Sequence, residues 1–264
     1  MTALRNIAAV LEKEWRHYFG SPIAYVVLTV WTFLFGRFFQ VALDFFLQRS
    51  MMMAQQMEMG GGPKMSLNEY VIRPVFHNMA VVALFVVPMV TMRLFAEEKR
   101  QGTMELLGTA PLTNVQIVLG KFFAAAGLYA LMIGAGLVNL VVLWRYATTP
   151  PEWKPVLTGF LALFLLGSCF IALGTFISTL TRNQIVAGIV SFCVFLGVWT
   201  LGWGAEDPTS GPVWKAVAYL GVTTHMDDMV KGVLDVKDIV FYLSFITFGL
   251  FLAHQSVESQ RWRA

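Results

Sequence analysis

The side chains of this sequence that could perform covalent chemistry are few and lie far apart. Gly167-Ser168-Cys169 places two nucleophilic residue types side by side within an apolar run. A nucleophile needs a base within hydrogen-bond reach, but no histidine lies clearly within an apolar segment at a matching depth; the four are His17, His77, His225 and His254. Small residues at such positions more often permit close approach of helices. We therefore expect a chain without enzymatic activity of its own.

The sequence also lacks the usual signals for binding phosphate or metal. The phosphate-binding pattern G-x-x-x-x-G-K-[ST] is absent, since Gly120-Lys121 is followed by Phe122. The methionine-rich stretch 51–65 offers thioethers, which are soft ligands for Cu(I). No histidine or cysteine lies nearby, and methionine also serves as a flexible filler. We predict no cofactor or metal site here, so any ATP must be hydrolysed by another polypeptide.

The composition indicates an integral membrane protein. Of 264 residues, 57% are hydrophobic and only 13% are charged, with a mean hydropathy of +0.64. A soluble domain carries about 25% charged residues. The net charge of +3 is small, so we expect no nucleic acid as a partner. Cys169 and Cys193 both lie in apolar runs and predict no disulfide.

Six segments are long and apolar enough to cross a bilayer as helices, which takes roughly 20 mainly apolar residues. They are residues 22–43, 75–93, 121–143, 157–179, 185–203 and 238–254. Only residues 181–184 separate the fourth from the fifth, which predicts a tight hairpin. The predicted fold is all-α and polytopic, with one transmembrane domain over residues 1–264.

Residues 1–21 differ from these six segments. One face of the predicted helix is apolar, comprising Leu4, Ile7, Ala8, Leu11, Trp15, Tyr18 and Phe19, and the other carries Arg5, Glu12, Lys13 and Arg16. Such a helix is too charged to span, so we expect it in the membrane interface, against lipids. The alternative is a solvated helix packed on a soluble domain, which this chain does not provide.

Basic residues near the ends of the spans predict the orientation. With a cytoplasmic N-terminus, the inner segments hold ten Lys and Arg and the outer segments eight, and three of the ten precede the first span. We expect both termini in the cytoplasm. Two long outer loops follow, residues 48–74 and 204–237. Val213, Val217 and Leu220 recur at helical spacing, which predicts a short surface helix in the second loop.

The cytoplasmic segment 94–120 contains FAEEKRQGTMELLGTAP, a dense run of charges and helix breakers between two apolar spans. Good helix formers extend the second span to Gly102, where we expect it to end. Thr103 can cap a short helix that Gly108 and Pro111 close, and Thr113 or Asn114 can cap the helix that follows.

This succession predicts an apolar facet within a charged rim. The facet comprises Met104, Leu106 and Leu107, and the rim comprises Glu97, Glu98, Lys99, Arg100 and Glu105. An apolar patch with a polar rim suits a docking surface. The alternative is a loop that is polar only because it lies in water, but solvation alone needs no such order of helix, glycine and cap.

Arg37, Gln40 and Asp44 form one polar stripe on the first span, at positions i, i+3 and i+7. Charges within the membrane usually face a bundle interior or a watery cavity, which predicts a translocation path or a subunit contact. The alternative is that Asp44 already lies outside the bilayer and that the arginine snorkels to the interface.

The run Glu98-x-x-x-Gly102-Thr103-x-Glu105-x-Leu107-x-x-x-Pro111, continued by Ile117-Val118-Leu119-Gly120-Lys121, resembles the ABC-2 family of ABC transporter permeases. It is most similar to the gliding-motility-associated branch. The resemblance covers essentially the whole chain. It implies that residues 97–111 form a coupling helix that contacts a separate ATP-binding subunit through Glu97, Glu98, Arg100, Gly102, Thr103, Met104, Glu105, Leu106, Leu107 and Pro111.

The resemblance further implies a permease subunit of an exporter in a bacterial or archaeal inner membrane. Two permease subunits, identical or different, would pair, and two ATP-binding subunits would supply ATP and Mg²⁺. The alternative is a membrane anchor that recruits an ATPase for envelope or motility machinery without moving a substrate. The sequence leaves the cargo open among lipid, polysaccharide, peptide and small drug.

Overall fold

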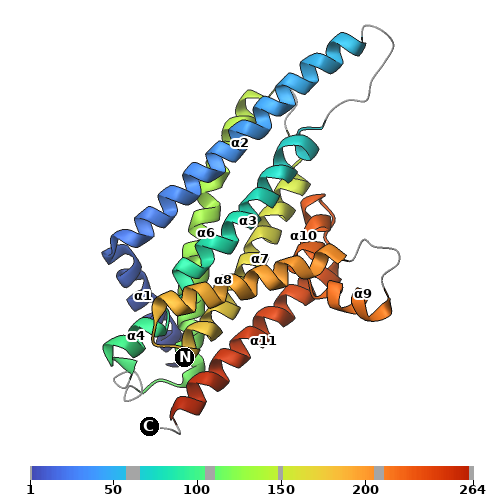
Figure 1. Cartoon of the computed structure of the whole chain (residues 1–264). Coiled ribbons are helices and arrows are strands. Elements are labelled where there is room, and N and C mark those ends of the chain that lie inside the picture. The colour runs from blue at the N-terminus through green and yellow to red at the C-terminus, as the bar shows by residue number, and fades with distance from the viewer. Residues whose placement is uncertain (1, 58–65, 105–110, 148–150, 205–210, 262–264) are drawn as a thin grey trace.

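The computed structural model describes residues 2–57, 66–104, 111–147, 151–204 and 211–261, which form a bundle of helices (Figure 1). The start of the first helix and the end of the last lie at the same end of the bundle, here called the proximal end; the opposite end is called distal. The helices are α1 (Thr2–Gly20), α2 (Pro22–Met57), η1 (Asn68–Ile72), α3 (Arg73–Thr91), α4 (Ala96–Gln101), α6 (Asn114–Tyr146), α7 (Trp153–Leu180), α8 (Gln184–Thr200), η2 (Leu201–Gly204), α9 (Pro212–Tyr219), α10 (Val222–Val230) and α11 (Val236–Arg261).

Six stretches of helix are long and apolar enough to cross a membrane, which confirms the six predicted spans. They comprise α2, η1 to α4 taken together, α6, α7, α8 with η2, and α11. Asn183 caps α8 by accepting from the amides of Ile185 and Val186, at 2.9 and 3.5 Å, so α7 and α8 form the expected tight hairpin. Large apolar side chains such as Phe33, Val138 and Phe248 are exposed on the outside, as lipid-facing positions require.

α2 is much longer than the sequence predicts. It contains 36 residues and continues to Met57, so the predicted loop 48–74 begins as helix. Residues 44–57 contain neither glycine nor proline, and leucine, methionine, glutamine and alanine favour helix. Met59 and Met65 of the methionine-rich stretch lie outside the described residues.

α7 lies at the centre of the bundle, where it packs against α3, α6, α8, α10 and α11. Gly167 faces Tyr129 of α6 so closely that an added Cβ would lie 2.0 Å from the tyrosine ring. The Tyr129 hydroxyl donates to the Leu163 carbonyl at 3.2 Å. The small residue therefore permits close helix contact.

Two short helices occupy the segment between α8 and α11. α9 occupies the position of the predicted surface helix, and both Val213 and Trp214 on it are exposed. α10 is not predicted from the sequence; it folds back against α7 and buries Val222, Met226 and Met229. Much of this segment is therefore part of the bundle.

The close contact between Gly167 of α7 and Tyr129 of α6 can be tested by enlarging the glycine. Gly167→Val should destabilise the protein by about 1–3 kcal/mol, because the added methyl groups force Tyr129 out of its position. The measurement is thermal unfolding of the purified chain in detergent. Gly134→Val on α6 is the matched control, since a Cβ there meets nothing within 4 Å. Equal melting temperatures for the two variants would contradict the packing described.

Candidate functional site

The segment that joins α3 to α6 at the proximal end is the candidate site. The sequence predicts one continuous helix to Gly102, but the backbone bends after Thr91 and a new helix, α4, begins at Ala96. Ser178 of α7 stabilises the bend. Its buried hydroxyl accepts from the amides of Phe95 and Ala96, at 3.0 and 3.1 Å, and donates to the Met92 carbonyl at 3.2 Å. A helix start leaves such amides without partners, so Ser178 fixes α4 to α7.

The end of α4 and the start of α6 lie where the sequence predicts them. Gly102 has a left-handed φ of 72° and ends α4, with the Thr103 amide donating to the Glu98 carbonyl at 3.0 Å. Thr113 caps α6 in a capping box with Gln116. The predicted short helix that starts after Thr103 falls largely on residues 105–110, outside the described residues, and so do Glu105, Leu106 and Leu107.

A network of four charged side chains joins α1, α4 and α6; Glu14, Glu98 and Lys121 are buried, and the Lys13 side chain is half-exposed. The Lys121 ammonium of α6 lies 2.8 Å from Glu14 and 3.0 Å from Glu98, and Lys13 lies 2.5 Å from Glu98 and 3.4 Å from Glu14. The side chain of Lys121 is only 1% exposed, and its ammonium lies 5.1 Å from the centre of the Phe95 ring. Two lysines and two glutamates leave no net charge.

The network stabilises its members as ions. Burial alone raises the pKa of Glu14, but the ammonium groups of Lys121 and Lys13 outweigh it and hold that pKa below the ordinary value. For Lys13, burial lowers the pKa, but the carboxylates of Glu98 and Glu14 raise it above the usual range. A carboxylate with a lowered pKa stabilises the fold above its ordinary pKa of about 4.5. The ion pairs are therefore fully formed at neutral pH.

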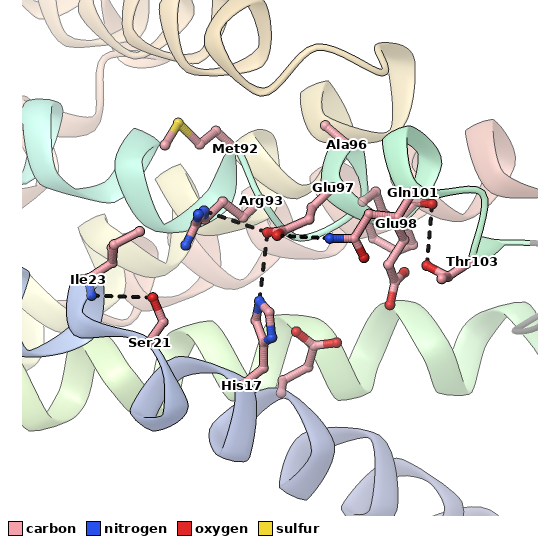
Figure 2. A network of polar contacts seen from close by, with 12 residues as sticks. His17, Ser21, Ile23, Met92, Arg93, Ala96, Glu97, Glu98, Gln101 and Thr103 are labelled. Carbon is pink, nitrogen blue, oxygen red and sulfur yellow. Dashed lines mark hydrogen bonds and ion pairs between the residues drawn. The ribbon is translucent and has the colours of Figure 1, made fainter.

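A second cluster lies beside the network (Figure 2). One Glu97 oxygen lies 3.7 Å from His17 of α1 and 3.6 Å from Arg93, and the other accepts from Gln101 at 3.3 Å. With the network, this cluster lines a cleft between α1, α4 and the start of α6. The two glutamates that begin α4 therefore both face α1.

Lys99 extends the contacts of α4 to the far side. Its ammonium donates to the Thr179 carbonyl at the end of α7. That carbonyl also accepts from Gln260 of α11 at 2.8 Å, and the Thr179 hydroxyl contacts Ser256 at 2.7 Å. A six-residue helix is thus connected to four long ones: α1, α6, α7 and, through Thr179, α11.

Comparison with protein families identifies the chain. Residues 8–249 match the family model described as "ABC-2 family transporter protein". The chain belongs to the ABC-2 family. Two curated relatives, from Escherichia coli strain K12 and Escherichia coli O157:H7, are both named "Probable multidrug ABC transporter permease YbhR". Each is 27% identical in an alignment of 212 residues that covers 74% of this chain and 55% of the relative, so the chain spans about half the length of these relatives.

The closer resemblance to the gliding-motility-associated branch is not supported by these matches. The family assignment covers α1 from Ala8 and the first half of α11, as far as Gly249. It therefore includes α1, the helix that the network joins to the segment between α3 and α6.

The described residues of the predicted coupling helix divide into two groups. Arg100, Gly102 and Pro111 are exposed, and Thr103 and Met104 are half-buried. Glu98 is only 8% exposed and faces α1, so the exposed rim that the sequence predicts does not include its carboxylate. The contact of this ABC-2 segment with an ATP-binding subunit stays a prediction.

The polar stripe of α2 lies on the outside of the bundle. Arg37, Gln40 and Asp44 are all exposed, and Arg37 donates to the Gln40 side chain at 2.7 Å. A path between the helices of one ABC-2 chain would need these residues to face inward. Their position fits a contact with a second subunit better, and that role stays a prediction.

Glu14 and Lys121 are not among the predicted site residues, although the sequence contains a signal for both. Glu14 follows Ile7 and Leu11 at helical spacing, so it belongs to the apolar face of α1. Lys121 directly precedes an apolar run. A charge on an apolar face indicates a buried partner of opposite sign, because an unpaired buried charge is strongly unfavourable. The partner itself, 107 residues away, is not visible in the sequence.

The coupling between Lys121 and its carboxylate partners can be tested by removing the lysine charge. Lys121→Met should destabilise the chain by about 3–5 kcal/mol, because Glu14 and Glu98 remain buried without their main counter-charge. Adding Glu14→Gln should restore part of this loss, which a double-mutant cycle in thermal or denaturant unfolding would measure. Arg16→Ala is the control, since it removes the exposed pair with Glu12 and should cost less than about 1 kcal/mol. Strict additivity of the two network variants would contradict the coupling.

Proposed function

We propose that this chain is the membrane subunit of an ABC transporter, an exporter whose ATP is hydrolysed by a separate subunit bound at residues 97–111. Membership of the ABC-2 family and the name of the relatives support this proposal. The observation that carries it is the way α4 is connected. Charged and hydroxyl groups join this short helix to α1, α6, α7 and α11, so a displacement of α4 cannot remain local.

The proposed mechanism is a rigid-body movement. ATP binding changes which conformation of the partner is favoured, and a ligand shifts such an equilibrium by its difference in affinity for the two states. The partner moves α4 and α1 together, because the ion pairs of the network hold both helices to each other and to Lys121. Ser178 and Thr179 transmit the displacement to α7 and α11. The chain itself binds, positions and moves, and it breaks no covalent bond.

Two permease subunits would enclose the path for the cargo, and the exposed stripe of α2 is a candidate for part of their contact. The relatives are named multidrug permeases, which favours small molecules among the cargo classes that the sequence leaves open. In this arrangement both termini and α4 lie on the cytoplasmic side of a bacterial or archaeal inner membrane, with ATP and Mg²⁺ bound by the partner.

Crosslinking tests the docking site directly. A photo-reactive residue in place of the exposed Gln101 should crosslink, in native membranes, to a polypeptide whose peptides contain a nucleotide-binding motif. The same residue at Val138, on the exposed apolar face of α6, should crosslink to lipid or to membrane proteins only. Arg100→Glu should weaken co-purification of the captured subunit by about tenfold or more, since charge reversal at an interface costs several kcal/mol.

Lys154→Glu is the matched control for Arg100, because it makes the same charge change on an exposed residue at the distal end. It should leave co-purification unchanged. Crosslinks from position 101 to no nucleotide-binding protein, or equal losses for the two charge reversals, would place the docking site elsewhere.

Transport distinguishes the permease from the membrane anchor. Co-reconstituted with the captured subunit in liposomes, a permease should show ATP hydrolysis that a substrate stimulates, together with ATP-dependent movement of that substrate. Lys121→Met should reduce stimulation more than basal hydrolysis, because the joint between α4 and α6 is weakened. An anchor would show neither stimulation nor movement with any member of a drug, lipid and peptide panel.

A further inference from the structure

α10 is folded into the distal half of the bundle by polar contacts at both ends. The Tyr242 hydroxyl of α11 donates to the Val222 carbonyl at 2.7 Å, at the first residue of α10. At the other end, Gly232 has a φ of 93° and ends the helix, with its amide donating to the Met229 carbonyl at 3.0 Å. Between these ends, two histidine–aspartate pairs connect α10 to its neighbours.

The first pair joins α10 to α3. Nε2 of His77 lies 2.6 Å from the Asp227 carboxylate of α10. Nδ1 of the same ring lies 2.8 Å from the Arg73 carbonyl. The imidazole is therefore placed between two acceptors, one of them charged.

The second pair joins α10 to α9 and α11. Nδ1 of His225 lies 2.7 Å from Asp238, and Nε2 lies 3.0 Å from the Tyr219 carbonyl at the end of α9. His225 is 4% exposed and Asp238 is 1% exposed. Phe241 stacks on the ring with 3.9 Å between centroids, so water has little access to the pair.

A neutral imidazole has one N–H donor, and its other nitrogen presents a lone pair. At His77 and at His225, one ring nitrogen lies at hydrogen-bond distance from a backbone carbonyl oxygen and the other from an aspartate oxygen, and an ionised carboxylate can only accept. Only the imidazolium, which donates from both nitrogens, satisfies both contacts. The neutral ring would leave a lone pair facing either the carbonyl or the carboxylate oxygen, depending on its tautomer, and at His225 this unfavourable contact would be buried.

We propose that protons are structural ligands of this segment, one at each histidine–aspartate pair, and that their release as the pH rises frees α10 from α3, α9 and α11. The site is the pair of imidazolium rings His77 and His225 together with Asp227 and Asp238. The inference goes beyond the transport function and does not depend on it, because it concerns the chain alone.

The direction of the pH effect follows from the protonation state of the imidazole that the folded protein stabilises. Hydrogen bonds that need the imidazolium contribute stability while the ring holds its second proton, and that stability is lost when a rise in pH removes this proton. The hydrogen bond from His77 lowers the pKa of Asp227, so that carboxylate stays ionised down to acid pH. The pairs are therefore intact at mildly acidic pH and break toward alkaline pH.

Other titratable groups surround the two pairs and set the midpoint of release. Arg73 and Lys231 are cations near Asp227, and they oppose the charge on His77. The remaining groups are Asp228 on α10, Tyr219 on α9, Glu69 and Glu152 at the cleft beside Arg73, Asp235, Lys237 and Tyr242 at or near the start of α11, and Cys169 on α7. The acidic groups favour the imidazolium, and the cations oppose it.

Hydrogen–deuterium exchange of the full chain in lipid nanodiscs tests the proposal. After correction for the intrinsic rate, amides of residues 222–230 should exchange about tenfold faster at about pH 9 than at about pH 6. Peptides from the centre of α7 should show no such change. An unchanged corrected rate in the α10 peptides of the wild-type protein would overturn the proposal.

Two variants assign the effect to the pairs. Asp227→Asn and Asp238→Asn keep an acceptor near each ring but remove the charge that stabilises the imidazolium, so each should lower the pH midpoint of release by about one unit or more. His254→Gln is the matched control, because that histidine pairs with Glu258 within α11, at 3.7 Å, and not with α10. It should keep the wild-type midpoint. Wild-type midpoints in both asparagine variants would also overturn the proposal.

A spectroscopic reading keeps the test independent of folding defects. In protein labelled with ¹⁵N-histidine, the rings of His77 and His225 should give imidazolium shifts at about pH 7, where an ordinary histidine is mostly neutral. The signals are assigned by their loss in His77→Gln and His225→Gln. Neutral-ring shifts for both residues at that pH would show that no structural protons are held.

Discussion

An ammonium group that is almost completely buried must find its counter-charges inside the protein, because an isolated charge in an apolar interior is strongly unfavourable. Lys121 finds them on two other helices, at Glu14 of α1 and Glu98 of α4. This constraint brings α1 to the same point as α4 and α6, which follow it about 85 and 107 residues later in the chain. Replacing the network by apolar residues could yield an equally stable protein. The ionic version adds a defined geometry, since each carboxylate must face an ammonium group.

The same constraint explains why the chain concentrates charge between two apolar spans. Among the described residues of this segment, Glu97, Glu98 and Lys99 all make contacts within the chain, and Arg100 is left exposed. The density of charge is therefore only partly a matter of solvation or of contact with a partner. Ser178 adds the hydroxyl that closes the bend, so the segment behaves as a joint with fixed partners on each side.

The sequence predicted what depends on local patterns. The six spans follow from apolar length, the end of α4 from Gly102, and the start of α6 from the cap at Thr113. It did not predict the bend before Ala96, because its cause is a hydroxyl on another helix, more than 80 residues away. α10 was missed for a similar reason. His225 and Asp227 are polar, so the sequence of α10 suggests an exposed loop. Their partners lie on α3 and α11, which are distant in the sequence or follow later.

The length of α2 has a consequence for the surroundings of the protein. Its 36 residues extend about 54 Å, whereas the hydrocarbon core of a bilayer is about 30 Å thick. Tilts of membrane helices reach about 40°, and even at that angle the helix would cover roughly 41 Å along the bilayer normal. In a membrane of ordinary thickness, two or more of its turns therefore lie among headgroups or in water. Longer lipid chains would cover more of α2 and reduce the length that emerges from the bilayer. The same chains would increase the mismatch of α8, whose 17 residues are shorter than the hydrocarbon core.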